Sequence, residues 1–127
     1  MAVILVIDDD PAMRRLMVRT LSAQQHRVIE AENGEDGLKL LNSEKPDLVI
    51  TDILMPQKEG IETIREIQER TPGTKIIAVS GGGSSQKLMF LDIARAFGAE
   101  AVLAKPFRPN QLIEAVESAL NSSASRA

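Results

Sequence analysis

The sequence predicts an α/β fold in which a doubly wound, five-stranded parallel sheet carries five helices divided between its two faces. Five short runs of valine, isoleucine and leucine recur along the 127 residues, each with the length and composition of a strand buried on both faces. Segments with helical spacing of apolar residues separate the runs, and strands that alternate with helices form parallel sheets through right-handed crossovers. Polar residues follow four of the runs directly. Together these observations predict one sheet with one polar edge.

The first strand and the first helix are separated by an abrupt change at residue 8. Residues 2–7 are all apolar and predict a strand, which stops at a run of aspartates. Asp10 followed by Pro11 predicts a helix start, because aspartate caps free backbone N–H groups and proline suits the first helical position. The apolar stripe of this helix is expected to pack on the sheet and comprises Met13, Leu16, Met17, Thr20 and Leu21.

The remaining strands and helices follow the same alternation. Strands are predicted at residues 27–31, 48–52, 76–79 and 101–104. Helices are predicted from apolar spacing around residues 38–41, 61–67, 88–95 and 112–120, and the last is expected to begin near Pro109. The glycine and serine run at residues 81–85 predicts a hinge loop after the fourth strand. His26, between the first helix and the second strand, is expected to be exposed and to play no part in the site.

Length and composition predict one domain at residues 1–121, followed by a polar tail at 122–127. We expect no attached output domain, and the alternative is that the tail of Ser and Ala begins a linker in a larger regulator. The absence of cysteine suits a reducing compartment, so we expect a cytoplasmic location. The apolar run at residues 2–7 is too short for a membrane anchor and lacks the basic flank of a signal peptide. A net charge of −3, with no Trp or Tyr, offers no basic or stacking surface, so direct nucleic-acid binding is not expected.

Polar residues at the strand ends are the candidates for a functional site. Asp8 and Asp9 follow the first strand, Asp52 ends the third, Ser80 follows the fourth and Lys105 follows the fifth. The carboxyl ends of parallel strands meet at one edge of the sheet, where open α/β sheets bind ligands. Three carboxylates there repel one another, and hard oxygen ligands without His or Cys favour Mg²⁺ accompanied by phosphate. Lysine and a hydroxyl suit phosphoryl oxygens, which leaves Asp52 as the nucleophile.

Four motifs occur in a fixed order over almost the whole chain: Ile7-Asp8-Asp9, Asp52 with Met55-Pro56 and Gly60, Ser80-Gly81, and Lys105-Pro106-Phe107. In this combination the sequence resembles the receiver domain of response regulators in two-component signalling. The resemblance implies a flavodoxin-like fold with strand order 2-1-3-4-5. It also implies a phosphoacceptor that takes its phosphoryl group from a histidine kinase or a histidine phosphotransfer protein. Such a domain catalyses its own phosphorylation and dephosphorylation and is not an enzyme with a separate substrate.

The resemblance also assigns roles to single residues. Asp52 corresponds to the phosphoacceptor, and Asp9, Asp52 and the backbone carbonyl of Leu54 correspond to the Mg²⁺ ligands. Asp8 is expected to hold the ion through water. Lys105 corresponds to the phosphoryl contact, and its bond to Pro106 is often cis in this family. Ser80 corresponds to the switch hydroxyl, whose movement alters the binding of a downstream protein target.

The sequence departs from the family pattern on the fifth strand. Receivers commonly carry an aromatic residue three positions before the lysine, and this chain has Val102 there. We therefore expect the loop at residues 81–85 and the helix after it to carry the switch by an order-disorder change. The residues two beyond Asp52 and two beyond Ser80 influence hydrolysis in this family. They are Leu54 and Gly82, whose side chains cannot hydrogen-bond water, which predicts a longer-lived phosphoryl group.

Two other functions remain open from the sequence. One is an interaction module of the same fold that signals without phosphorylation, an interpretation that Val102 favours and the intact acidic set opposes. The other is a phosphatase of the haloacid dehalogenase type, which places its aspartate nucleophile on the first strand. Asp8 and Asp10 have the required spacing, but Ala12 stands where that class needs threonine, and the chain has no cap insertion.

Overall fold

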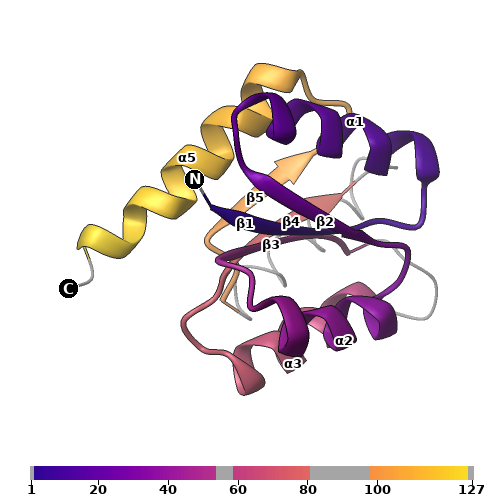
Figure 1. The fold of residues 1–127 in the computed structure, drawn as a ribbon, viewed down its shortest axis with the longest axis vertical. Helices are drawn as coiled ribbons and strands as arrows, with labels where there is room; N and C mark the ends of the chain where they lie inside the picture. The colour runs from indigo at the N-terminus through magenta and orange to yellow at the C-terminus, as the bar shows by residue number, and fades with distance from the viewer. Residues whose placement is uncertain (1, 54–58, 81–97, 126–127) are drawn as a thin grey trace.

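The computed structural model describes residues 2–53, 59–80 and 98–125, and these form a parallel sheet between two layers of helices (Figure 1). The strand order is β2-β1-β3-β4-β5, as the family resemblance implied. The strands are β1 (Val3–Ile7), β2 (Arg27–Ala31), β3 (Leu48–Asp52), β4 (Lys75–Ser80) and β5 (Ala101–Ala104). The described helices are α1 (Pro11–Ala23), α2 (Gly34–Glu44), α3 (Glu59–Arg70) and α5 (Pro109–Ser125).

The two helical layers bury the two faces of the sheet separately. Helices α1 and α5 lie on one face, and α2 and α3 lie on the other (Figure 1). Successive residues of β1 alternate between the two sides, so Ile4 and Val6 belong to the core under α1 and α5. Leu5 and Ile7 belong to the core under α2 and α3. Each of these four side chains is fully buried, which contributes about 1.5–3 kcal/mol per side chain to folding.

The register of the strands aligns their carboxyl ends. Ile7, the last residue of β1, pairs with Thr51 of β3, and Asp52 pairs with Val79 of β4. Ser80 in turn pairs with Ala104 of β5. The residues that follow these pairs therefore reach the same edge of the sheet, which confirms the expected convergence of the strand ends.

The start of α1 forms as predicted. Asp10 is the N-cap in extended conformation, and its Oδ1 accepts hydrogen bonds from the amides of Ala12 and Met13 at 3.0 and 3.5 Å. Pro11 occupies the first turn, where its missing N–H costs nothing. The assignment of Asp10 to the helix start is thus confirmed.

One residue of the predicted α1 stripe lies elsewhere. Leu16 was expected to pack on the sheet, but it is 39% exposed, whereas Met17 and Leu21 are fully buried. At 100° per residue, a stripe centred on Met17 and Leu21 turns Leu16 toward its border and the solvent. The expectation for Leu16 was therefore wrong.

Of the last two predicted helices, the structure describes only the second. Helix α5 begins at Pro109 as expected and continues to Ser125, four residues beyond the expected domain boundary at 121. The helix expected around residues 88–95 and the hinge loop at 81–85 lie outside the described residues. Among the described helices, none is long and apolar enough to cross a membrane.

Candidate functional site

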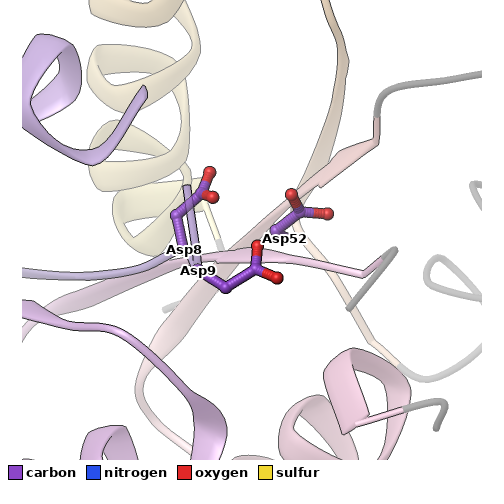
Figure 2. Close-up of side chains that lie close together, drawn as sticks. All are labelled: Asp8, Asp9 and Asp52. Carbon is purple, nitrogen blue, oxygen red and sulfur yellow. The ribbon is translucent and has the colours of Figure 1, made fainter. Parts of the chain in front are cut away.

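Three carboxylates gather at the carboxyl edge of the sheet (Figure 2). Asp8 and Asp9 follow β1 and Asp52 ends β3, the strand that pairs with β1. One oxygen from each side chain lies within 4.8 Å of the other two. Asp8 is fully buried, Asp52 is 6% exposed and Asp9 is exposed. Three negative groups at this spacing need positive charge nearby.

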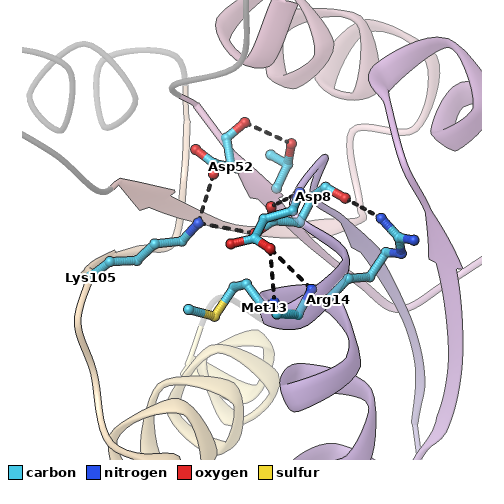
Figure 3. A network of polar contacts seen from close by, with 8 residues as sticks. Asp8, Met13, Arg14, Asp52 and Lys105 are labelled. Atoms are coloured by element: carbon cyan, nitrogen blue, oxygen red, sulfur yellow. Dashed lines mark hydrogen bonds and ion pairs between the residues drawn. The ribbon is translucent and has the colours of Figure 1, made fainter.

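Lys105 supplies one such charge (Figure 3). Its Nζ donates hydrogen bonds to Asp52 Oδ2 at 2.8 Å and to Asp8 Oδ2 at 3.1 Å. The backbone holds Lys105 in place, since its amide donates to the carbonyl of Ser80 at 2.7 Å, and the peptide bond to Pro106 is cis as the resemblance implied. A single ammonium thus serves two buried carboxylates.

Burial and neighbouring charges together shift the pKa values of Asp8 and Lys105. It raises the pKa of the Asp8 carboxyl, and Asp52 raises it further, although the Asp10 amide and Lys105 act in the opposite direction. Burial alone would lower the pKa of Lys105, but its hydrogen bonds and charge interactions with Asp52 and Asp8 outweigh this and raise the pKa. Lys105 is therefore held in its charged form, while the ionised form of Asp8 is costly.

The acidic group fits a divalent cation. Its donors are carboxylate oxygens from Asp8, Asp9 and Asp52, and the group contains no His or Cys. Hard oxygen donors of this kind suit Mg²⁺, which uses few carboxylates and completes its octahedron with water and phosphate. A cation would also add to the positive charge that Lys105 supplies to these acids. The carbonyl of Leu54, which the resemblance added to the ligands, lies outside the described residues.

Ser80 reaches the same edge from β4. It is fully buried, and its Oγ has no hydrogen-bond partner among residues 2–53, 59–80 and 98–125. A buried hydroxyl without a partner loses about 1–3 kcal/mol relative to a bonded one. Its position and its unmet hydrogen bond make it available to a ligand at the edge.

The structure gives Arg14 a role and corrects the expectation for His26. Arg14, to which the sequence assigned no role, donates from Nη1 to the backbone carbonyl of Asp8 at 2.7 Å. Its place one turn after the N-cap Asp10 could have indicated this, because helical side chains lean toward the N-terminus. His26 was expected to be exposed, but only 8% of its side chain is, because Ala2 and Glu117 of α5 contact it.

Comparison with known proteins identifies the family. Residues 4–117 match the response regulator receiver domain. The chain belongs to this receiver family. Among curated proteins, the receiver is 35% identical over 114 residues to the chemotaxis protein CheY of Thermotoga maritima, covering 89% of this chain and 92% of CheY. It is 36% identical over 121 residues to the transcriptional regulatory protein GlrR of Escherichia coli, covering 95% of this chain and 27% of GlrR.

Solved structures agree with this assignment. The receiver superimposes on NtrX from Brucella abortus with a TM-score of 0.91 at 30% identity, covering 98% of this chain and 28% of NtrX. It superimposes on a CheY-like receiver domain protein from Methanospirillum hungatei with a TM-score of 0.88 at 28% identity, covering 100% and 99% of the two chains. The receiver therefore spans about a quarter of the length of GlrR and NtrX, and nearly all of the two single-domain relatives.

Membership in this family settles the general class of function. Receivers are signalling domains of two-component systems, whose response regulators act with histidine kinases and downstream targets. The family and the flavodoxin-like fold implied by the sequence motifs are confirmed. This assignment favours the receiver over the dehalogenase-type phosphatase, which places its nucleophile on the first strand. The chemical roles of single residues remain predictions.

Proposed function

We propose that this receiver accepts a phosphoryl group on Asp52 from the phosphohistidine of a histidine kinase or phosphotransfer protein in the cytoplasm, with Mg²⁺ bound. The observation that carries the proposal is the position of Asp52. Its carboxylate is nearly buried at the end of the central strand β3, hydrogen-bonded to Lys105 and within reach of Asp8 and Asp9. The carboxylate of Asp52 therefore lies next to both the candidate cation site and the ammonium group of Lys105.

The other two acids are less suited to the nucleophilic role. Both oxygens of Asp8 already accept hydrogen bonds, Oδ1 from the Asp10 amide at 2.9 Å and Oδ2 from Lys105 at 3.1 Å, and the residue is fully buried. Asp9 is exposed, so its carboxylate is not shielded from water as a stabilised acyl phosphate would need. Asp52 combines near-complete burial with a small exposed fraction through which a donor can approach.

Phosphoryl transfer exchanges one bond to phosphorus for another. A carboxylate oxygen of Asp52 forms the new P–O bond while the P–N bond to the donor imidazole breaks, and the imidazole nitrogen keeps the electron pair. Bound Mg²⁺ offsets the charge of the acids and of the phosphoryl oxygens. Lys105 holds its positive charge beside Asp52, where negative charge moves during transfer.

Ser80 links the modified site to the rest of the sheet. Its buried Oγ can donate to a phosphoryl oxygen and thereby gain the hydrogen bond that it lacks among the described residues. The backbone of Ser80 already accepts from the Lys105 amide, so a movement of Ser80 bears directly on Lys105. We propose that this coupling starts the change that a downstream protein detects.

The proposal is tested by intact-mass analysis after incubation with acetyl phosphate and Mg²⁺. One added phosphoryl group is expected on the wild-type chain, and its loss is expected with EDTA or with Asp52→Asn. Asp10→Asn is the matched control, because Asp10 carries the same acid but caps α1 outside the carboxylate group. Phosphorylation that survives Asp52→Asn would disprove the assignment.

A phosphorylation-independent interaction module is the second candidate, and Val102 is the residue that favours it. Val102 is partly buried and packs against the apolar core beneath α2 and α3. Val102 has no aromatic ring, which receivers commonly carry at this position. Partner binding that is unchanged by Asp52→Asn and by acetyl phosphate would support this candidate over the phosphoacceptor.

A further inference from the structure

The side chain of Arg14 joins three elements next to the acidic group. From α1, its Nη1 donates to the carbonyl oxygen of Asp8 at 2.7 Å, and its Nε forms an ion pair with Glu30 of β2 at 2.9 Å. The Arg14 side chain is only 17% exposed, so the guanidinium is held in place. Figure 3 shows that it approaches Asp8 from the side opposite Lys105.

The contact controls the peptide plane between Asp8 and Asp9. A trans peptide is rigid, so fixing the Asp8 carbonyl also fixes the direction of the Asp9 amide and the position of its Cα. The position of the Asp9 carboxylate depends on the Arg14 contact more than the position of the Asp8 carboxylate does. The Asp8 carboxylate is held by Asp10 and Lys105, whereas no hydrogen bond holds the exposed Asp9 side chain within the described part of the chain.

The charge of Arg14 does not explain its location. A guanidinium this near a cation site repels the cation, even when Glu30 neutralises part of the charge. The positive charge of Arg14 therefore cannot attract Mg²⁺. Its remaining possible role is to position the groups that bind the ion. Groups behind the direct ligands commonly act this way, since their loss weakens metal binding although they do not touch the metal.

We propose that Arg14 is a positioning residue, which orients the Asp9 carboxylate toward the cation by holding the Asp8–Asp9 peptide plane. The proposal rests on the cation site of the proposed function. It adds a residue from α1 to a site otherwise built from strand ends. Charge and position predict opposite effects: loss of the charge alone tightens Mg²⁺ binding, while loss of the hydrogen bond weakens it.

The test compares Arg14→Met with Arg15→Met in the unphosphorylated protein. Both changes remove one positive charge from α1, but Arg15 is exposed and makes no hydrogen bond or ion pair to another described side chain. Mg²⁺ is titrated while the amide NMR signals of Asp9 and Asp52 are followed. We expect Arg14→Met to raise the dissociation constant about tenfold, Arg15→Met to leave it unchanged or slightly lower, and Arg14→Lys to recover much of the loss.

The outcomes separate positioning from simple stabilisation. A lower melting temperature for Arg14→Met with unchanged Mg²⁺ affinity would overturn the proposal, and so would tighter binding. Glu30→Gln, which leaves the Asp8 contact intact, is expected to change the affinity less than Arg14→Met.

An NMR measurement on the metal-free protein tests the role of Arg14 separately from Mg²⁺ binding. In the metal-free protein, Arg14→Met should shift the Asp9 amide ¹⁵N signal more than Arg15→Met does, because that nitrogen shares a peptide plane with the Asp8 carbonyl. If the wild type does not bind Mg²⁺, the proposed function fails even when this shift is seen. An Asp9 signal that both variants leave unchanged overturns the role of Arg14.

Discussion

The charged residues at the two edges of the sheet have different numbers of partners. At the amino edge, Asp47, Lys75 and Glu100 each have a partner of their own. Asp47 and Val3 exchange two hydrogen bonds, of 2.8 and 2.9 Å, and Lys75 lies 3.9 Å from Glu100. At the carboxyl edge, one ammonium serves Asp8 and Asp52, and a third carboxylate lies within 4.8 Å.

The difference distinguishes a structural edge from a binding edge. Asp47, Lys75 and Glu100 at the amino edge have partners within the chain, so their charges need no ligand to offset them. Among the described residues, the carboxyl edge holds three carboxylates against one ammonium, and the buried hydroxyl of Ser80 has no partner there. Such an arrangement is stable only because the rest of the fold enforces it, and a cation with a phosphoryl group would satisfy both deficits.

The largest expected effect comes from removing the shared ammonium. Lys105→Met removes the ammonium that Asp8 and Asp52 share, which should lower the free energy of unfolding by about 3 kcal/mol. Saturating Mg²⁺ should restore at least half of that loss, because the cation replaces the missing charge. Urea unfolding with and without Mg²⁺ measures both numbers.

Lys75→Met is the matched control at the other edge. Lys75 and Glu100 are about as buried as the Lys105 pairs, with 10% and 11% of their side chains exposed. The control should also lose stability, but Mg²⁺ should stabilise it no more than it stabilises the wild type. Equal Mg²⁺ increments in the two variants would contradict the distinction between the edges.

A smaller effect is expected from neutralising the buried acid. The pKa of folded Asp8 lies above its ordinary value of 3.8, so its contribution favours the folded state below that pH and is lost as the pH rises through the raised pKa. Without Mg²⁺, Asp8→Asn should therefore be more stable than the wild type by about 1 kcal/mol near pH 7, and the gain should vanish near pH 4.

The control for this prediction is Asp9→Asn. Asp9 belongs to the same carboxylate group but is exposed, so its neutralisation should change the metal-free stability by less than about 0.5 kcal/mol. Thermal unfolding in EDTA across the pH range measures both variants. A wild type that is more stable than Asp8→Asn near pH 7 would show that the hydrogen bonds to Asp8 outweigh its burial.

The same contrast explains what the sequence could predict. The meeting of Asp8, Asp52 and Lys105 followed from strand alternation, because parallel strands bring their carboxyl ends together whatever the details of packing. The cap at Asp10 followed from a purely local preference. These predictions needed only topology and short-range chemistry.

What the sequence could not predict depends on exact placement. Leu16 lies at the border of a helical stripe, where periodicity does not decide between core and solvent. His26 is covered by Glu117 of α5, from the far end of the chain. The place of Arg14 one turn after the N-cap indicates that its side chain leans toward residue 8, but not that it donates to the Asp8 carbonyl. The roles of Asp52, Ser80 and Leu54 remain predictions for the experiments above.

The smallest expected effect comes from Ser80, where the direction of the change in the free energy of unfolding is the informative result. Ser80→Ala removes a buried hydroxyl without a partner in the described part of the chain, so the metal-free protein should be unchanged or more stable, by up to about 1 kcal/mol. Thr71→Val is the control, because the Thr71 hydroxyl donates to the Ile67 carbonyl at 3.1 Å and its loss should destabilise by about 1 kcal/mol. Urea unfolding distinguishes the two signs. A loss of stability in Ser80→Ala as large as in Thr71→Val would mean that the Ser80 hydroxyl already makes a hydrogen bond in the unphosphorylated protein. A phosphoryl oxygen would then not be needed as its partner.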